Sequence, residues 1–143
     1  KGFKFAIVVS QWNAQVTGAL LNGAIDGILK NGGQEADIDI IEVPGSYELI
    51  SGADIVLRNK DIDAVICLGC VIQGETRHFD FICDAVANGI SNVAIKYNKP
   101  VIFGVLTTDN LEQALDRAGG KHGNKGEEAA ITAIQMAHIS KKY

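Results

Sequence analysis

A cluster of polar residues directly follows the most hydrophobic run of the chain. The run AVICLGCVI (64–72) is followed by Gln73 and Gly74 and then by the group ETRH (75–78). Apolar residues then recur at helical spacing, so His78 is expected at a helix N-terminus, where backbone N–H groups favour an anion such as phosphate. A histidine can give or take a proton at neutral pH. The segment predicts an anion site with an acid–base group beside it; the alternative is an ordinary helix cap with a solvent-facing histidine.

Aromatic residues accompany three other apolar runs. SQWN (10–13) follows the first run, VPGSYEL (43–49) contains the end of the second, and VIFG (101–104) lies within the fourth. Trp12, Tyr47 and Phe103 would supply aromatic faces near one edge, enough to hold a flat heterocycle by stacking. Two alternatives stay open: Phe103 is a core residue, and Glu48 serves only to complement a helix dipole.

These residues need a framework, and the hydrophobic pattern predicts one. Four apolar, β-branched runs predict strands over 3–10, 37–43, 64–72 and 100–107, with amphipathic segments between them. Strands that are apolar throughout are buried on both faces, so we predict an α/β fold: a three-layer, doubly wound, flavodoxin-like sandwich with a parallel four-stranded sheet. Ligands of such sheets bind beyond the carboxyl ends of the strands.

Capping signals predict where the helices begin and end. Asn13 is the expected N-cap of a first helix that stops at Gly32-Gly33, and further helices are expected over 47–59 and 78–98. Asp109 with Glu112 suggests the capping pair of a short fourth helix, closed by Gly119-Gly120. Asn124 is expected to open the last helix, which carries a stripe of small residues suited to close packing: Ala129, Ala130, Ala133, Ile134 and Ala137.

Composition narrows the possible partners. We expect a single domain over residues 1–143, with 13 Lys and Arg against 17 Asp and Glu. No basic run marks a nucleic-acid surface, no apolar run reaches membrane-spanning length and no leader pattern precedes the first strand, so a cytoplasmic protein is expected. The hydrophobic share of 47%, with 16 glycines, indicates surface buried against other subunits. The alternative is a glycine-rich monomer.

Several apparent motifs fail on their geometry. CLGC (67–70) has zinc-like spacing, but residues three apart on a strand point to opposite faces, so we expect its cysteines to be structural thiols and no metal site. GGKHGNKG (119–126) departs from the phosphate-loop pattern and follows a helix instead of a strand. No G-x-G-x-x-G follows the first strand, which argues against dinucleotide binding.

Five stretches together resemble the 6,7-dimethyl-8-ribityllumazine synthase family of riboflavin biosynthesis. They are VPGSYEL, LGCVIQGETRHFD, VIFGVLTT, DRAG and GNKG, in family order and spacing, and the resemblance runs from about residue 5 to residue 137. It implies condensation of 5-amino-6-(ribitylamino)uracil with 3,4-dihydroxy-2-butanone 4-phosphate, releasing phosphate and water, without metal or organic cofactor. The alternative is a catalytically silent flavodoxin-like module that binds a flavin or lumazine.

The resemblance also implies residue roles. Trp12 would stack on the pyrimidine, where phenylalanine is commoner in the family, and Tyr47 likewise stands in a place often held by phenylalanine. His78 would move protons during imine formation and phosphate loss. The other implied substrate contacts within the chain are Ser46 and Glu48 on the ring edge and ribityl chain, backbone groups of Cys70, Val71 and Ile72 in the pyrimidine pocket, and Glu75 and Thr76 at the phosphate.

A shared active site is the last implication. The family forms pentamers with each site between neighbouring subunits, so Phe103, Arg117 and Lys125 would come from the next chain, with Arg117 on the phosphate. Some members close twelve pentamers into an icosahedral shell of 60 subunits. No long insertion interrupts GGKHGNKG, so the sequence permits either a free pentamer or a shell.

Overall fold

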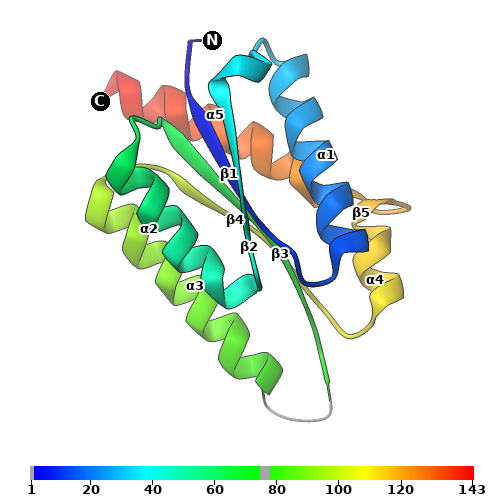
Figure 1. Ribbon diagram of the computed structural model, residues 1–143. Helices are drawn as coiled ribbons and strands as arrows, with labels where there is room; N and C mark the ends of the chain where they lie inside the picture. The colour runs from blue at the N-terminus through cyan, green and yellow to red at the C-terminus, as the bar shows by residue number, and fades with distance from the viewer. Residues whose placement is uncertain (1, 75–77) are drawn as a thin grey trace.

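A parallel sheet of four strands forms the centre of the protein (Figure 1). The computed structural model describes residues 2–74 and 78–143. The strand order is β2-β1-β3-β4, with β1 at Phe5–Ser10, β2 at Ile38–Val43, β3 at Ala64–Ile72 and β4 at Val101–Thr108. The predicted α/β fold is confirmed, because all three strand pairings in this sheet are parallel.

Helices cover both faces of this sheet (Figure 1). Residues of α1 (Ala14–Lys30), α4 (Leu111–Asp116) and α5 (Lys125–Lys142) pack on one face, while α2 (Leu49–Asn59) and α3 (His78–Tyr97) cover the other. Strand β1 alternates between them: Ile7 belongs to the first core and Val8 to the second. Two full cores explain why the central strands β1 and β3 are apolar at almost every position.

The small-residue stripe of the last helix has the predicted role. Ala130, Ala133 and Ala137 of α5 are buried in the same core as α1. Gly27 of α1 lies so close that an added Cβ would stand 2.9 Å from the Cβ of Ala130. Small side chains on both helices allow this close approach, since larger ones would force the helices apart.

Three local expectations about the helices are wrong. The second helix begins at Leu49, because Ser46–Glu48 forms a separate 3₁₀ turn with Glu48 N–H bonded to the Gly45 carbonyl at 3.1 Å. The cap of α4 is Asn110, whose Oδ1 accepts from Gln113 N–H at 2.9 Å, instead of Asp109. Gly119 and Gly120 do not close α4; they belong to a hairpin, β5 (Ala118–Gly120) with β6 (Gly123–Asn124).

A fourth expectation concerns Asn13, which occupies the N-cap position of α1 without capping it through its side chain. Its backbone is left-handed, at φ 61° and ψ 51°, and its carbonyl accepts from Val16 and Thr17 N–H at 2.9 and 3.0 Å. Its side chain points elsewhere, to β3. A side-chain cap usually needs an extended backbone at this position, which brings the side-chain oxygen over the helix end.

Asp54 links the two helices of one layer and predicts a pH-dependent stability. Lys96 Nζ and Tyr97 Oη of α3 donate to its Oδ1 at 2.9 and 3.0 Å, and these hydrogen bonds, led by that of Lys96, lower the pKa of Asp54. A lowered carboxyl pKa stabilises the fold above the unfolded value of about 4, and this contribution is lost as the pH falls through the folded pKa.

We therefore expect Asp54→Asn to lower Tm by about 2–4 °C at pH 7 and by less at a pH below about 4, as the Asp54 carboxylate of the parent becomes protonated. Thermal melts at both pH values measure this. Asp26→Asn is the matched control, because Asp26 is exposed on α1 and makes no ion pair within the described part of the chain. An unchanged difference at low pH would contradict the role assigned to the Asp54 carboxylate.

Candidate active site

A cavity of about 310 Å³ lies at the carboxyl ends of β1, β2 and β3, beside the start of α3. Segments from four separate parts of the sequence reach it, and its volume suits part of a small ligand. Its lining residues are Trp12, Asn13, Gly45, Ser46, Tyr47, Glu48, Cys70, Val71, Ile72, His78 and Ile82. We call this the first cavity.

The loop after β1 presents an aromatic ring to the first cavity. Gln11 N–H donates to the Val43 carbonyl at 2.8 Å and Trp12 N–H to the Pro44 carbonyl at 3.1 Å, so the loop is fixed against the end of β2. The Trp12 side chain remains 70% exposed and that of Tyr47 55% exposed. Two exposed aromatic rings at one cavity leave faces available for stacking.

Ser46 contributes a buried hydroxyl whose atoms have no hydrogen-bond partner among the described residues. Its side chain packs against β3 at Gly69, where an added Cβ would stand 2.7 Å from Ser46 Oγ. A buried hydroxyl without a partner costs free energy, roughly 1–3 kcal/mol. A ligand group or an ordered water bound in the first cavity would recover that cost.

The cysteines of β3 take no part as nucleophiles. Burial raises the pKa of Cys67 to about 12 and the pKa of Cys70 to about 11, so both thiols are protonated at neutral pH. Cys67 belongs to the core under α2 and α3, and Cys70 to the core under α1 and α5, as the alternation of a strand predicts. Both are free, as is Cys83. Cys70 therefore offers the first cavity its backbone.

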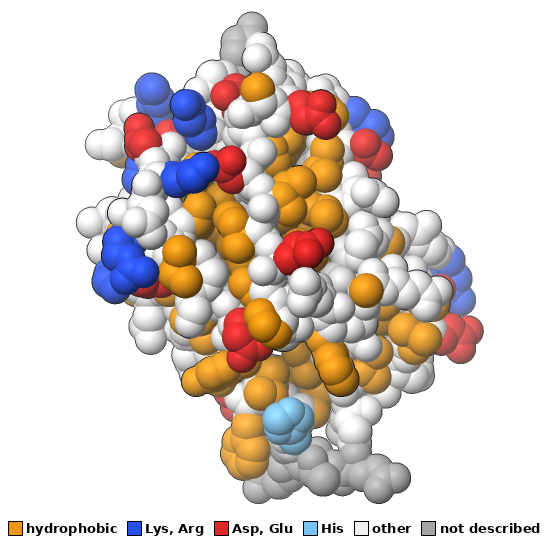
Figure 2. All heavy atoms as spheres, viewed as in Figure 1, with side chains coloured by type: hydrophobic (Ala, Val, Ile, Leu, Met, Phe, Trp, Pro, Cys, Tyr) orange, Lys and Arg blue, Asp and Glu red, His pale blue; other side chains and the backbone are white. Residues whose placement is uncertain are grey.

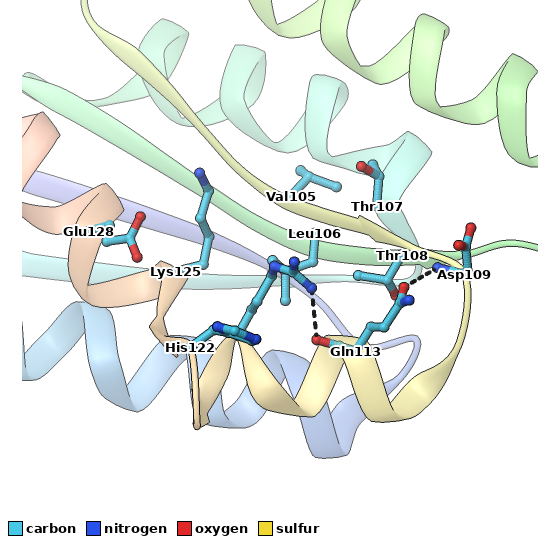
Figure 3. A pocket seen from close by; sticks show the side chains of 10 residues that line it. Val105, Leu106, Thr107, Thr108, Asp109, Gln113, His122, Lys125 and Glu128 are labelled. Atoms are coloured by element: carbon cyan, nitrogen blue, oxygen red, sulfur yellow. Dashed lines mark hydrogen bonds between the residues drawn. The ribbon is translucent and has the colours of Figure 1, made fainter.

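A second cavity, of about 450 Å³, lies beside β4 and carries positive side chains (Figure 3). Arg117 at the end of α4, His122 in the hairpin and Lys125 at the start of α5 line it together with residues 105–109 of β4 and its exit. Figure 3 shows Lys125 and His122 reaching this space from α5 and the hairpin. Arg117 and Lys125 can bind an anion there, although the carboxylates of Asp109 and Glu128 also line the hollow.

Local hydrogen bonds hold the cations of the second cavity together. Lys125 N–H donates to the Arg117 carbonyl at 2.8 Å, and the Arg117 guanidinium donates to the Gln113 carbonyl at 3.4 Å (Figure 3). Asn124 caps α5, with Oδ1 accepting from Gly126 and Glu127 N–H at 2.8 and 3.2 Å. The start of α5 therefore fixes Lys125 directly beside the residue that ends α4.

Phe103 does not share an edge with Trp12 and Tyr47, contrary to the expectation for a single chain. It lies in β4 opposite Cys67, five residues before the strand ends, and lines a third hollow of about 330 Å³. That hollow shares Lys125 and Glu128 with the second cavity. Phe103 lies in the edge strand β4, and the residues that line its hollow come from β4 and α5.

The predicted site residues thus divide into two groups within one chain. Eight of the predicted residues line the first cavity: Trp12, Ser46, Tyr47, Glu48, Cys70, Val71, Ile72 and His78. Phe103, Arg117 and Lys125 line the second and third, and the two groups have no lining residue in common. Glu75 and Thr76 lie outside the described residues. Sequence reasoning missed Asn13 and His122 as lining residues; the tolerance of asparagine for left-handed backbone was the available signal for Asn13.

Other hollows carry less chemistry. The largest described apolar groove, about 540 Å³, runs between β2 and α2, and Figure 2 shows hydrophobic side chains gathered on this face. Ile40, Ile55 and Val56 line it, with the Lys60–Asp39 ion pair at its margin.

Among the described residues, no group of three or more His, Cys, Asp or Glu side chains is placed to hold a metal ion. None of the described helices combines the length and the apolar character needed to cross a membrane.

Comparison with known proteins adds independent information. The model of the family described as 6,7-dimethyl-8-ribityllumazine synthase matches residues 2–141. A protein of that name from Cytophaga hutchinsonii is 64% identical over 132 residues, covering 92% of this chain and 83% of the relative. Those from Bacteroides fragilis (54% identical, 93% of each chain) and Aquifex aeolicus (49% identical, 99% of this chain and 92% of the relative) are also similar.

Proposed function

The chain belongs to the 6,7-dimethyl-8-ribityllumazine synthase family, and we propose that the first cavity is where it condenses its two substrates. The protein is a transferase of riboflavin biosynthesis that joins 5-amino-6-(ribitylamino)uracil to 3,4-dihydroxy-2-butanone 4-phosphate, releasing phosphate and water. One observation carries the site assignment: eight predicted substrate residues from separate segments line one cavity.

The aminopyrimidine fits the aromatic and backbone groups of this cavity. Trp12 would stack on the flat ring, while the backbone groups of Cys70, Val71 and Ile72 would hydrogen-bond its edge, as the end of an open strand allows. Glu48, at the N-cap position of α2, would accept hydrogen bonds from hydroxyl groups of the ribityl chain. Ser46 and Tyr47 would complete the contact with the ring edge and the chain.

His78 is placed to move protons between the reactants. It is the first residue of α3 and lines the first cavity. When an amine attacks a carbonyl, the nitrogen loses a proton and the departing oxygen gains one, so a group that both accepts and donates a proton serves imine formation. The same imidazole would then assist the loss of phosphate. Glu75 and Thr76 would lie at the phosphate, next to the N-terminus of α3.

The phosphate requires positive charge that the first cavity does not supply from its described residues. Its lining includes Glu48 and His78 but neither lysine nor arginine, whereas Arg117 and Lys125 line the second cavity on the far side of β3. We propose that a neighbouring copy brings its Phe103, Arg117 and Lys125 against the first cavity. A ring of identical subunits in head-to-tail contact joins two different surfaces in this way.

The enzyme's main contribution would be positioning. Holding two small reactants together reaches effective molarities of about 10⁵ M or more, and proton transfer adds roughly 10²–10⁴-fold. Neither contribution needs a metal or an organic cofactor, so we propose that none takes part.

The decisive experiment for this function is turnover. Purified protein is mixed with the aminopyrimidine and the butanone phosphate, and the lumazine is followed optically. Product formation well above the uncatalysed rate is expected. No rate above background, with riboflavin still quenching the Trp12 fluorescence, would favour the catalytically silent binding module instead.

Subunit sharing has its own test, which is complementation between two damaged variants. His78→Gln impairs the first group and Arg117→Ala the second, so each variant alone is nearly inactive. When the two variants are co-expressed at equal levels and assemble at random into rings, about a quarter of the interfaces should have both groups intact. About a quarter of the parental activity should then return. If each site were contained in one chain, mixing would restore nothing.

Trp12 predicts a substitution with a moderate effect. Trp12→Ala should raise the KM for the aminopyrimidine about 5- to 10-fold, since aromatic stacking is worth roughly 0.5–1.5 kcal/mol beyond burial. Trp12→Phe should stay within about twofold of the parent, because an aromatic face remains. Steady-state kinetics on both variants measures the difference. Equal KM values for the alanine and phenylalanine variants would contradict stacking.

The assembly and its location complete the proposal. We propose a pentamer, as the family resemblance implies; the two separate groups of site residues require only that neighbouring copies meet, and sedimentation velocity would distinguish a pentamer from a 60-subunit shell. Small molecules are its substrates. A cytoplasmic location agrees with the three free cysteines of the described chain, which suit a reducing compartment.

A further inference from the structure

The loop carrying Trp12 is attached on two sides by different kinds of contact. On the β2 side Gln11 and Trp12 N–H donate to the carbonyls of Val43 and Pro44, and the exposed Gln11 side chain adds a bond from Nε2 to Glu42 Oε1 at 3.3 Å. On the β3 side a side chain makes the bond, from Asn13 Nδ2 to the Cys70 carbonyl at 3.2 Å. The loop therefore spans the ends of three adjacent strands: two backbone hydrogen bonds secure it on the β2 side whatever its side chains are, whereas its bond to β3 depends on the Asn13 side chain.

Asn13 adopts a backbone conformation that most residues avoid. Its φ of 61° and ψ of 51° are left-handed, and among the described residues Asn98 is the other non-glycine residue with positive φ. Left-handed backbone disfavours residues with a Cβ, although asparagine tolerates it better than most. The consequence is directional: the Asn13 side chain turns away from the end of α1 and toward β3.

The Cys70 carbonyl needs such a partner because β1 ends too early to supply one. The β1–β3 pairing runs from Phe5↔Ala64 to Val9↔Leu68, whereas β3 continues to Ile72. Beyond Leu68, the β1 side of β3 has no paired strand. The side-chain amide of Asn13 donates a hydrogen bond to β3 beyond the point where the β1 backbone stops pairing. This is the part of β3 that lines the first cavity.

We propose that Asn13 is a positioning residue of the active site. Its amide holds two groups in a fixed relation: the Trp12 ring, one residue away, and the backbone of Cys70 to Ile72. The distance between a stacking face and an edge-binding backbone sets which planar ligand fits between them. This inference rests on the proposed function, because the ligand placed there is the aminopyrimidine.

Two glycine substitutions separate the bond from the backbone strain. Asn13→Gly keeps a residue suited to positive φ and removes the side-chain amide. The fold is therefore retained while the hydrogen bond to the Cys70 carbonyl is lost. Asn98→Gly is the matched control, since Asn98 has φ 54° directly after α3 and lines no part of the first cavity. Asn13→Asp is the second variant: it keeps the shape of the side chain but replaces the donor with acceptors.

For Asn13→Gly we expect a KM for the aminopyrimidine about 5- to 10-fold above the parent, with kcat changed less than about twofold, as the loss of one partly buried hydrogen bond implies. Fluorescence anisotropy of Trp12, the single tryptophan, should fall without any ligand. Asn13→Asp should show the same changes in KM and anisotropy as Asn13→Gly. Asn98→Gly should have the KM and the anisotropy of the parent. Thermal melts confirm that each variant is folded.

The outcomes separate this inference from the proposed function. A parent that turns over, beside an Asn13→Gly variant with parental KM and anisotropy, would overturn the positioning role alone. Equal changes in Asn13→Gly and Asn98→Gly would also overturn it, because the effect would then be general. A parent without turnover would overturn the proposed function and, with it, the role of Asn13 toward the aminopyrimidine; the anisotropy would still show whether the amide holds the loop.

Discussion

Replacing Arg117 with alanine should lower kcat/KM for the butanone phosphate by about 10³-fold, the largest effect that we expect from a single substitution. Arg117 lines the second cavity with His122 and Lys125, and its guanidinium can bind a phosphate with two parallel hydrogen bonds. Removing one partner of a buried charge pair costs roughly 2–5 kcal/mol, and a neighbouring subunit would cover this pair. A fall of about 10³-fold in kcat/KM lies within that range. Steady-state kinetics with each substrate varied in turn measures it.

Two controls make the Arg117 result specific. Arg117→Lys keeps the charge but loses the planar fork, so it should recover only part of the rate. Arg58→Ala removes an arginine from α2, where its guanidinium lies 3.8 Å from Asp54, and should leave kcat/KM unchanged. Inorganic phosphate should inhibit the parent more strongly than the Arg117→Ala variant. Equal inhibition of the two would show that Arg117 does not contact the phosphate.

Replacing His78 with glutamine should lower kcat by about 10²-fold while leaving the KM values within a few-fold. Glutamine keeps a hydrogen-bonding side chain in the first cavity but cannot exchange a proton, so the loss falls on the chemical steps. The reaction should remain measurable, because positioning of the two reactants persists without the imidazole. The effect should therefore be smaller than that of Arg117→Ala.

Single-turnover rates at saturating substrate measure this second effect directly. His138→Gln is the control: His138 lies near the end of α5, with its ring packed edge-on against Phe3 at 4.8 Å between centroids, and it should not change kcat. A His78→Gln variant with parental kcat, or one more impaired than Arg117→Ala, would contradict the assigned division between proton transfer and phosphate binding.

Much of this protein is predictable from local sequence. The apolar runs predict all four strands of the parallel sheet, with β3 correct at both ends, and the stripe of small residues predicts close packing of the last helix. Errors arose where neighbouring residue types compete for one role. Asp109 and Asn110 are both good caps, and only the hydrogen bond from Gln113 N–H shows that Asn110 takes the position.

The first cavity was predictable for a related reason. The motifs that contain Trp12, Tyr47 and His78 each follow a strand, and parallel strands end at one edge of the sheet, so chain direction alone brings these residues together. The sequence by itself therefore determined the fold class and the meeting of these three motifs at one cavity.

Only the tertiary structure decided how the remaining residues are arranged. Strand order is not encoded in any one segment, and the edge position of β4 is what separates Phe103, Arg117 and Lys125 from Trp12. The direction of the Asn13 side chain likewise depends on a left-handed backbone that residue type permits but does not require. Both are long-range outcomes, because contacts between residues far apart in the chain select among conformations that are locally similar in energy.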